Sequence, residues 1–371
     1  MGHLPPPASY LWQAGSVSSF FARQIGSGSG MKVEACRERA LWDAYVDAAP
    51  SASNYHRWGW KEVIEKAFGW PTFYLVAKEA TEIKGVLPLV WQKSWLFGSF
   101  VTSLPFFSHA GVLAESREAE EALVGEAITL ARELGAGYLE LRHRCDHGLG
   151  LPTKTSKVSV LVMVEPDEDK MLKSLRSEVR TKIRKAVKCG LTGEMHGEDA
   201  LNDFYAIFAE KMRDLGTPVY SKSLFSEIFR AFGADTHICI VRHQGKPIAA
   251  TFLAEFRGMI ESLWSCSRRR LVTMEPNALL NWTILRYAGG NGCHIFDFGR
   301  STVGSGPHRY KLQWSSQEVP LYWDYWSPEG KNRSDPDPAN PKYDIFIRLW
   351  HRLPLRLANV LGPSIVRRLP Y

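Results

Sequence analysis

The 371-residue sequence has no paired cysteine motif, no long apolar run and no recognisable leader. Its six cysteines are scattered and none forms a CxxC pair, a usage that favours a reducing compartment over a disulfide-stabilised secreted fold. A membrane-spanning helix needs about 20 consecutive apolar residues, and no such run exists. No segment has the charged start and apolar centre of a signal peptide. We therefore expect a cytoplasmic protein.

Motifs for covalent catalysis, mononucleotide binding and metal binding are also missing. No nucleophile elbow is present, and no Ser or Cys has an evident His partner in the sequence. The stretch GRSTVGSG (299–306) follows a predicted strand, but Pro307 and a strand-like run come next, so we expect no helix there and exclude Rossmann and P-loop motifs. We interpret 299–306 as a mobile acceptor-site loop. Residues 143–147 (HRCDH) lack an established ligand spacing, so no metal site is predicted.

What the chain does contain is apolar material for sizeable cores. The hydrophobic content is 45%, with 13 Trp, which excludes global disorder, and the length favours two domains of roughly 150 residues. The net charge of +7 suggests an anionic partner such as phosphate, nucleic acid or a membrane face. Simple solubility explains the same charge equally well.

Two stretches of the chain show the same order of predicted elements. Each has a strand hairpin, then a helix ended by glycines, then a short strand. The elements of the first stretch lie at 73–92, 118–134 and 138–143, and those of the second at 237–266, 275–287 and 294–298. This repetition predicts a duplicated α/β unit.

The sequence divides into five segments. Residues 1–30, with PPPAS and GSGSG, are expected to be a disordered upstream extension. A first α/β unit at 31–155 and a second at 156–326 follow, the second carrying the active-site strand. A linker rich in Pro and Asp occupies 327–342, and 343–371 form a C-terminal helical segment.

The C-terminal segment is both basic and amphipathic. Five arginines accompany an apolar stripe. Such a pattern can lie on an anionic membrane surface. Packing of the stripe on the first unit explains it as well, and the two are compatible if the arginines stay outside. A peripheral position at the inner membrane face therefore stays open.

Two basic clusters are candidates for holding the phosphates of a donor. The predicted helix 171–188 carries seven Lys and Arg residues against Glu178 alone, and such a helix can grip phosphates without reading bases. A solvated face over buried Leu, Val and Ile explains the pattern nearly as well. The second cluster precedes the predicted helix at 275. The candidate phosphate-binding residues are Arg180, Arg184, Arg268, Arg269 and Arg270.

The most informative motif is HIFDFGRSTVGSGPHRYKLQW (294–314). It predicts a buried strand that ends by projecting polar groups into a cleft, a glycine-containing loop, and a second strand-like run. FDFGRS followed by RYK-x-QW resembles the C-terminal signature of FemAB-type peptidyltransferases and their BioF-like acetyltransferase relatives. In the Fem enzymes this stretch reads Y-D-F-G-G and then F-K. Here Arg replaces the second Gly, and Ser follows the final Trp where the family has Gly.

The resemblance extends from about Trp42 to Trp326 and includes NYHRWGW (54–60) and MRDLGTPV (212–219). The sequence is most similar to the FemAB-like subgroup associated with exosortase/PEP-CTERM systems. The resemblance implies an α/β fold of two tandem GNAT-like domains, with mixed sheets flanked by helices. It also implies that the C-terminal segment packs back on the first domain.

The resemblance implies an acyltransferase with no tightly bound cofactor, whose acyl donor is a co-substrate. Ordinary GNAT enzymes hold coenzyme A in a Q/R-x-x-G-x-G/A loop. The arginine run before residue 275 has no glycine, and the literal R-x-x-G-x-G at 132–137 ends a helix instead. This absence favours aminoacyl-tRNA, the donor of the Fem enzymes, over acyl-CoA. The implied acceptor is an amine of a cell-envelope, peptidoglycan or exopolysaccharide precursor, free or lipid-linked, such as an amino sugar.

The motif also implies the site residues. Lys311 matches the family Lys and would stabilise the developing oxyanion, and Asp297 could accept a proton. Candidate substrate-binding residues are Arg300, Ser301, Tyr310, Arg213 and Tyr220. Two other functions stay open: a conventional acetyl-CoA-dependent N-acetyltransferase, and a non-catalytic ligand-binding protein of the same fold.

Overall fold

The structure is a computed structural model that describes residues 30–94, 98–315, 317–328 and 341–369. Within them, one mixed sheet of 13 strands runs through the whole molecule. Along the sheet the strands are β1 (Met31–Ala35), β2 (Thr72–Glu79), β3 (Glu82–Ser94), β4 (Gly98–Thr102), β6 (Leu139–His143), β13 (Gln317–Trp326), β7 (Thr153–Met163), β12 (Ile295–Thr302), β11 (Met259–Ser267), β10 (Lys246–Phe256), β9 (Thr236–His243) and β8 (Leu191–His196), with β5 (Leu113–Ala114) beside β3. The β4–β6 and β11–β12 pairs are parallel and the others antiparallel.

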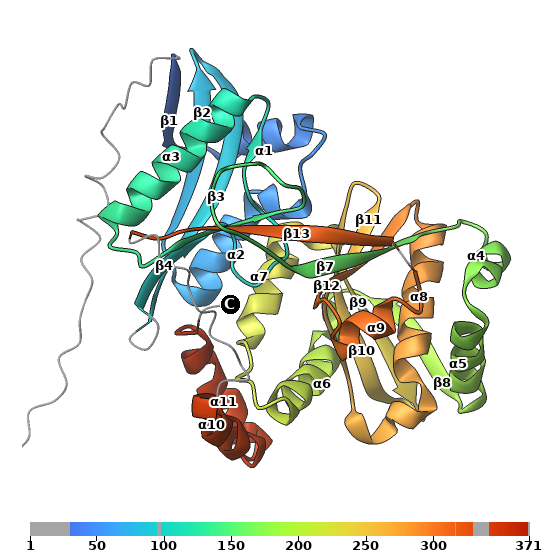
Figure 1. Cartoon of the computed structure of the whole chain (residues 1–371). Coiled ribbons are helices and arrows are strands. Elements are labelled where there is room, and N and C mark those ends of the chain that lie inside the picture. Colours follow the sequence, from blue (N-terminus) through green and yellow to red (C-terminus); the bar gives the residue numbers. More distant parts are fainter. Residues whose placement is uncertain (1–29, 95–97, 316, 329–340, 370–371) are drawn as a thin grey trace, which may run out of the picture.

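Helices cover this sheet in two groups (Figure 1). The N-terminal unit, β1 to β6, carries α1 (Arg39–Ala48), α2 (Gly59–Phe68) and α3 (Arg117–Glu133). The C-terminal unit, β7 to β13, carries α4 (Glu168–Ser174), α5 (Ser177–Lys188), α6 (Leu201–Asp214), α7 (Lys222–Phe232), α8 (Pro276–Gly290) and α9 (Gly306–Lys311). Short 3-10 turns lie at η1 (Asn54–His56), η2 (Glu198–Ala200), η3 (Gly233–Asp235) and η4 (Arg269–Met274). This arrangement confirms the predicted fold class, mixed sheets flanked by helices.

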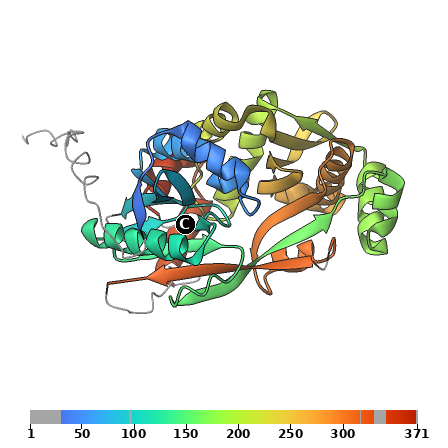
Figure 2. The same ribbon diagram turned by 90° about the horizontal axis from the view of Figure 1, so that it is seen from above.

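Two long strands join the units. β13 pairs with β6 through residues 322–326 and with β7 through residues 317–324, and the other edge of β7 pairs with β12. Figure 2 shows β7 and β13 running from one lobe to the other along the same side of the molecule. The sheet hydrogen bonds therefore continue across the predicted boundary near residues 150–156.

The units also share a hydrophobic core. The ring centroid of Trp60 in α2 lies 4.8 Å from that of Phe232 in α7 and 4.2 Å from that of Phe107. The helices approach closely at Gly59, where a Cβ would lie 2.7 Å from the Phe232 ring. Because glycine alone avoids that clash, this position sets the α2–α7 contact.

Two local predictions were wrong. The run after Gly304 is not strand-like: α9 begins at Gly306, because Ser305 caps it by accepting a hydrogen bond from the His308 N–H and Pro307 suits a first helical turn. The expectation that no helix follows 299–306 is thus overturned.

The predicted helix 171–188 is two helices, α4 and α5, because Leu175 and Arg176 are extended. Leu175 is buried, and the Arg180 side chain donates to the carbonyls of Lys173 (3.0 Å) and Leu175 (2.6 Å). These bonds satisfy carbonyls at the end of α4 that have no helical partner.

The C-terminal helices α10 (Pro341–His351) and α11 (Leu355–Val366) lie against α6. They also reach the N-terminal unit, since Arg367 donates to the Ala67 carbonyl (3.0 Å) and the Trp70 indole donates to the Arg367 carbonyl (3.3 Å). The segment, which was expected on the first unit, thus contacts both. The predicted extension and most of the predicted linker lie outside the described residues. Of the helices described, none combines the length and apolarity needed to cross a bilayer.

Candidate functional site

The site begins where two parallel strands separate. β11 and β12 pair only through residues 259–261 and 295–297, so Glu261 and Asp297 are the last partners. Beyond them β11 continues to Ser267 alongside β10, while β12 stays paired with β7, with a register shift between Asp297 and Arg300. A cavity of about 660 Å³ lies beside the diverging strands, and both contribute to its wall.

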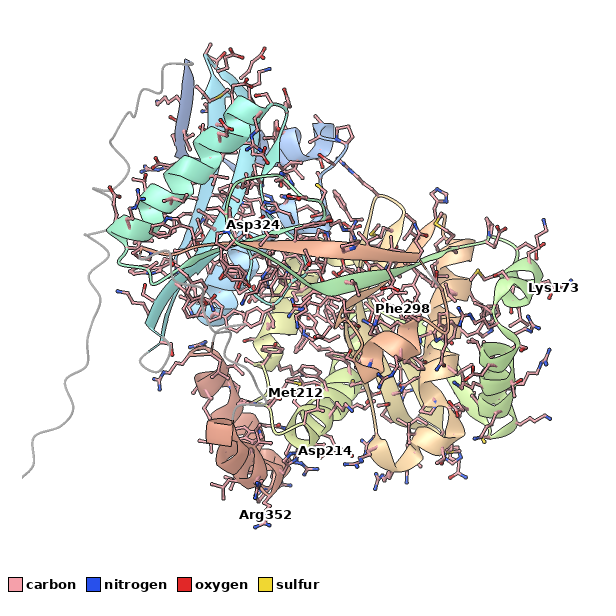
Figure 3. The ribbon with its side chains drawn as sticks, viewed as in Figure 1. Lys173, Met212, Asp214, Phe298, Asp324 and Arg352 are labelled. Atoms are coloured by element: carbon pink, nitrogen blue, oxygen red, sulfur yellow. The ribbon has the colours of Figure 1, made fainter. Side chains whose placement is uncertain are left out.

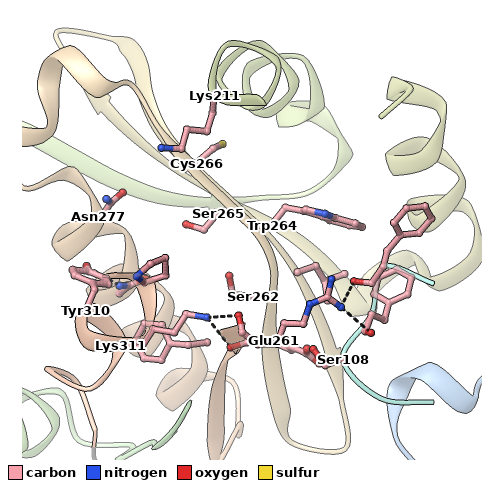
Figure 4. A pocket seen from close by; sticks show the side chains of 18 of the residues that line it. Ser108, Lys211, Glu261, Ser262, Trp264, Ser265, Cys266, Asn277, Tyr310 and Lys311 are labelled. Carbon is pink, nitrogen blue, oxygen red and sulfur yellow. Dashed lines mark hydrogen bonds between the residues drawn. The ribbon is translucent and has the colours of Figure 1, made fainter. Parts of the chain in front are cut away.

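Both units line this cavity. The C-terminal unit supplies residues from β11, β12, α6, α8 and α9, and the N-terminal unit supplies Tyr55 and residues 106–108. Figure 4 shows Tyr310 and Lys311 on one side, Trp264 and Ser108 toward the other, and Lys211 reaching in from above. The cavity is thus partly aromatic, with a few convergent charged and polar groups, as is usual for a ligand site.

A glycine shapes the floor of the cavity. Gly299 has φ +70°, and a Cβ there would lie 2.6 Å from the Ser262 carbonyl oxygen. Asp297 holds this turn, since its carboxylate accepts from the Gly299 N–H (2.8 Å), from Arg144 (2.9 Å) and from the Ser159 hydroxyl. Asp297 is fully buried and is not among the residues lining the cavity.

Lys311 projects from α9 onto that turn. Its ammonium donates to the carbonyls of Gly299 (2.7 Å) and Arg300 (3.0 Å), which leaves one N–H for a ligand (Figure 4). Burial lowers the pKa of Lys311 to about 8, while Asp297 and Glu261 oppose the shift. The group can therefore exist as ammonium or as amine near neutral pH.

Glu261 is a buried carboxyl in the same wall. Burial, reinforced by Asp297, raises the pKa of Glu261 to about 8, against the influence of Arg144, of a hydrogen bond with Tyr55 and of Lys311. The sequence prediction missed Glu261 and Tyr55. A single carboxylate in the apolar run MIESLWS was the available signal, but its place opposite Asp297 depends on the parallel register of β11 and β12.

Arg300 secures the contact between the units. Its guanidinium donates to the carbonyls of Phe106 (2.8 Å) and Phe107 (2.9 Å) and lies 5.5 Å from the Trp323 ring centroid. Burial, followed by repulsion from Arg142, lowers the pKa of Arg300 to about 10. Phe106 is held at φ +76°, a conformation that costs a non-glycine residue energy, so these bonds fix a strained cavity wall.

The other predicted substrate-binding residues are in different places. Tyr310 and Tyr220 line the cavity, and the Tyr310 hydroxyl accepts from the Asn281 amide (3.1 Å). Ser301 is buried outside the lining, and its hydroxyl has no hydrogen-bond partner among the residues that the structure describes. Arg213 is not in the lining either, because it pairs with Asp214 (2.8 Å), while the preceding residues of α6 face the cavity.

The predicted phosphate-binding arginines also differ in environment. Arg268 pairs with Glu210 at 3.1 Å, and Arg180 closes the end of α4. Arg184 on α5 and the pair Arg269 and Arg270 in η4 are exposed. α5 packs on α8, and η4 leads directly into α8, so the exposed basic residues lie around the start of that helix.

Comparison with known proteins finds a family match for the part of the chain that supplies most of the cavity wall. Residues 173–312 match the model of the acetyltransferase (GNAT) domain, and the match includes β11, β12 and α9. Over this part the chain is similar to a GNAT acetyltransferase domain. Among curated protein sequences, none matches the chain.

Solved structures share the fold over most of the chain. FemX superposes with a TM-score of 0.59 at 15% identity, covering 78% of this chain and 96% of FemX. A tandem GNAT protein from the clavulanic acid biosynthesis pathway gives 0.51 at 10% identity, with 82% and 100% covered. The C-terminal domain of a protein described as a lysylphosphatidylglycerol synthetase from Agrobacterium fabrum gives 0.51 at 12% identity, with 73% and 88% covered. At these identities the likeness concerns the fold.

The domain match over residues 173–312 supports the GNAT part of the predicted recognition, and the fold shared with FemX agrees with its FemAB-like part. An acyl-CoA co-substrate is consistent with a GNAT domain. The individual site residues and the two domain boundaries stay predictions.

Proposed function

We propose that this protein transfers an activated acyl group directly to an amine in the cavity between β11 and β12. The observation that carries the proposal is that Glu261 and Lys311 both line the cavity beside the separating strands. Burial shifts the pKa of each group to about 8. One group can take a proton and the other can offer positive charge at the same pH. That combination suits acyl transfer without a covalent enzyme intermediate.

The chemistry uses the two groups in turn. Glu261, as carboxylate, accepts the proton that the acceptor ammonium loses, and the neutral amine attacks the acyl carbonyl carbon. Lys311 donates its remaining N–H to the oxyanion that develops there. The C–N bond forms and the bond to the leaving oxygen or sulfur breaks. The attacking nitrogen, which bears a positive charge after the attack, gives up its proton to the leaving group, and the product is a neutral amide. We assign the proton-accepting role to Glu261 because Asp297 is fully buried and already accepts three hydrogen bonds.

Aminoacyl-tRNA is the donor that we favour. The start of α8, where ordinary GNAT enzymes bind coenzyme A phosphates, is preceded here by η4 and by Glu275, whose carboxylate disfavours an anion at this helix end. The exposed Arg184, Arg269 and Arg270 around it could contact a polyanion more extended than coenzyme A.

For the acceptor we propose an amino sugar of a cell-envelope precursor. Phe106, Phe107, Tyr220 and Trp264 form an aromatic wall, and flat apolar rings suit the faces of a sugar ring. The family resemblance supports a peptidoglycan or exopolysaccharide precursor, including one of a PEP-CTERM system. Lipid-linked and soluble forms both agree with the cavity.

The test compares donors. Binding of labelled acetyl-CoA and of labelled aminoacyl-tRNA is measured over a salt series, followed by transfer to a nucleotide-linked amino sugar. We expect tRNA binding that weakens steeply with salt, about tenfold or more between 50 and 200 mM, because phosphate contacts release counterions. The variant Arg269→Ala/Arg270→Ala should bind tRNA more weakly, and Arg37→Ala/Arg39→Ala on the N-terminal unit is the matched control.

If the protein binds acetyl-CoA saturably, transfers its acetyl group and does not bind tRNA, the donor is acetyl-CoA and the aminoacyl-tRNA proposal is wrong. Binding of neither donor together with no transfer would contradict the proposed enzyme and favour a non-catalytic role.

A further inference from the structure

Exposed apolar side chains gather on the C-terminal helices. Of the eleven large hydrophobic residues that are exposed in the described chain, five lie between residues 346 and 361, so the clustering is not that of scattered surface residues. A sixth, Leu215, precedes Gly216, which lies against Ile347 of α10. We call the six residues the C-terminal apolar patch: Leu215, Phe346, Leu349, Leu357, Val360 and Leu361.

Helix α11 has two faces, and both are apolar. Its inner face is small, with Ala358, Gly362 and Val366 buried, and Gly362 approaches Val219 so closely that a Cβ would lie 2.8 Å from its N atom. The outer face holds Leu357, Val360 and Leu361, spaced three and four residues apart and therefore on one side of the helix. Val360 is 72% exposed. The inner face packs on the rest of the protein, so intramolecular packing does not explain why the outer face is apolar.

Beyond residue 344, the charged side chains of the C-terminal segment are all arginines. The sequence from 345 to 371 contains five arginines and no acidic residue. Arg352 and Arg356 are exposed, and among the described residues no salt bridge to either is found. Figure 3 shows Arg352 at the lower tip of the molecule, pointing outward. The nearby Asp214 is paired with Arg213.

We propose that the C-terminal apolar patch docks on the surface of an anionic lipid bilayer. An apolar face bordered by arginines matches the acyl boundary and the negative headgroups of such a surface, and none of the described helices is fit to span it. A second copy of the chain is a poorer fit, because a two-fold contact would set the arginine borders of the two copies against each other.

Docking would also bring the proposed transfer site close to the membrane. α10 and α11 lie against α6, which supplies Lys211 to the cavity wall. Gly362 backs Val219, the neighbour of the lining residue Tyr220. A lipid-linked acceptor could then reach the cavity from the bilayer. This consequence, unlike the docking itself, rests on the proposed acyl-transfer function.

The test is co-sedimentation of the full chain with vesicles of phosphatidylcholine alone or with about 30% phosphatidylglycerol. We expect binding to the anionic vesicles that weakens several-fold when salt is raised from about 0.1 to 0.5 M. Leu357→Glu/Val360→Glu and, separately, Arg352→Glu/Arg356→Glu should each reduce binding about tenfold or more. Both pairs are exposed, and circular dichroism checks that each variant is folded.

The matched control is Val187→Glu, an exposed apolar residue on the basic helix α5. It should bind vesicles as the wild type does. The proposal would be overturned by any of three results. These are a loss of vesicle binding in the control as large as in the patch variants, equal binding of the wild type to both vesicle types, or no vesicle binding by the wild type. A dimer in sedimentation analysis that Val360→Glu dissociates would also overturn it. Vesicle binding is read without any transfer assay, so its failure and that of the proposed function are distinguishable.

Discussion

Burial of two charged groups of opposite sign gives the cavity its chemistry. Desolvation lowers the pKa of Lys311 and raises that of Glu261, and both reach about 8. Because the groups also attract each other, they titrate as a pair. At a pH near 8 each is partly in the form that the proposed reaction needs.

The pH dependence of transfer follows from these directions. The carboxylate form of Glu261 increases as the pH rises through about 8, while the ammonium form of Lys311 decreases above about 8. The transfer rate should therefore follow a narrow bell centred near pH 8. Glu261→Gln should lower the rate about 100-fold or more and remove the ascending limb. Lys311→Arg, which keeps its charge at high pH, should remove the descending limb.

Initial rates between pH 6 and 10 check this prediction. A wild-type rate that does not change across that range would contradict it. Retention of the ascending limb in Glu261→Gln would assign the proton transfer to another group.

The sequence alone predicted some residues of the cavity wall and missed others. Lys311 could be predicted as a candidate because it lies in a motif with the spacing of a known family, and the structure has it in the cavity wall. Glu261 could not be identified, because one carboxylate in an apolar strand has no partner until the parallel register brings it opposite Asp297. Arg300 was expected in an acceptor cleft, and it lines the cavity while holding two carbonyls of residues 106–107.

Among the elements, β12 decides the shape of the site. Its pairing with β7 shifts register between Asp297 and Arg300, and Gly299 in the shift has a positive φ and lies against Ser262. The turn offers two carbonyls to Lys311 and at the same time separates β12 from β11. The cavity therefore depends on a backbone conformation that only glycine adopts there without a clash.

A pair of glycine substitutions separates the clash from the positive φ. Gly299 and Gly304 have φ of +70° and +74°, but a Cβ at Gly304 meets nothing within 4 Å. Each substitution to Ala should lower the free energy of unfolding by about 1–2 kcal/mol, because alanine is strained in the left-handed conformation. Gly299→Ala should cost clearly more and should also slow transfer. Thermal unfolding and transfer rates of the two variants test this, and equal stability losses would contradict the close contact with Ser262.

Elements of the chain were predictable where the residue pattern was regular. The duplicated order of strands and helices was visible in the sequence, whereas α9 was mistaken for a strand. Six residues are too short a stretch to show helical periodicity, and the local signals are the Ser305 cap and Pro307 in the first turn. The break between α4 and α5 depends on the burial of Leu175 in the tertiary core and on a side-chain bond from Arg180 that forms only once the chain has turned there.

At the scale of the whole molecule, the two units are built into one another. β13 pairs with strands of both, and Trp60 and Phe232 pack across the α2–α7 contact. The sequence indicated two units, but it could not reveal a shared sheet, because strand pairing between β6 and β13 joins residues far apart in the chain. The cavity is lined by residues of both units, so it forms only where the units are joined.

The core that the two units share should determine how the protein unfolds. The described part of the chain should unfold in one cooperative transition, because neither unit retains a complete core and sheet without the other. Calorimetry and far-UV circular dichroism should give coincident midpoints. Two separate transitions would contradict the shared core and support independently folding domains.

The decisive measurement is the single-turnover rate of acyl transfer by Lys311→Met at saturating donor, with the donor affinity measured in parallel. The matched control is Lys182→Met, a partly buried lysine that bonds Glu178 and Gln313 near α9 without lining the cavity. We expect Lys311→Met to lose about 100-fold or more in rate with little change in donor affinity, as on removal of an oxyanion donor, and the control to keep its rate. An unchanged rate in a folded Lys311→Met protein would contradict acyl transfer at this site.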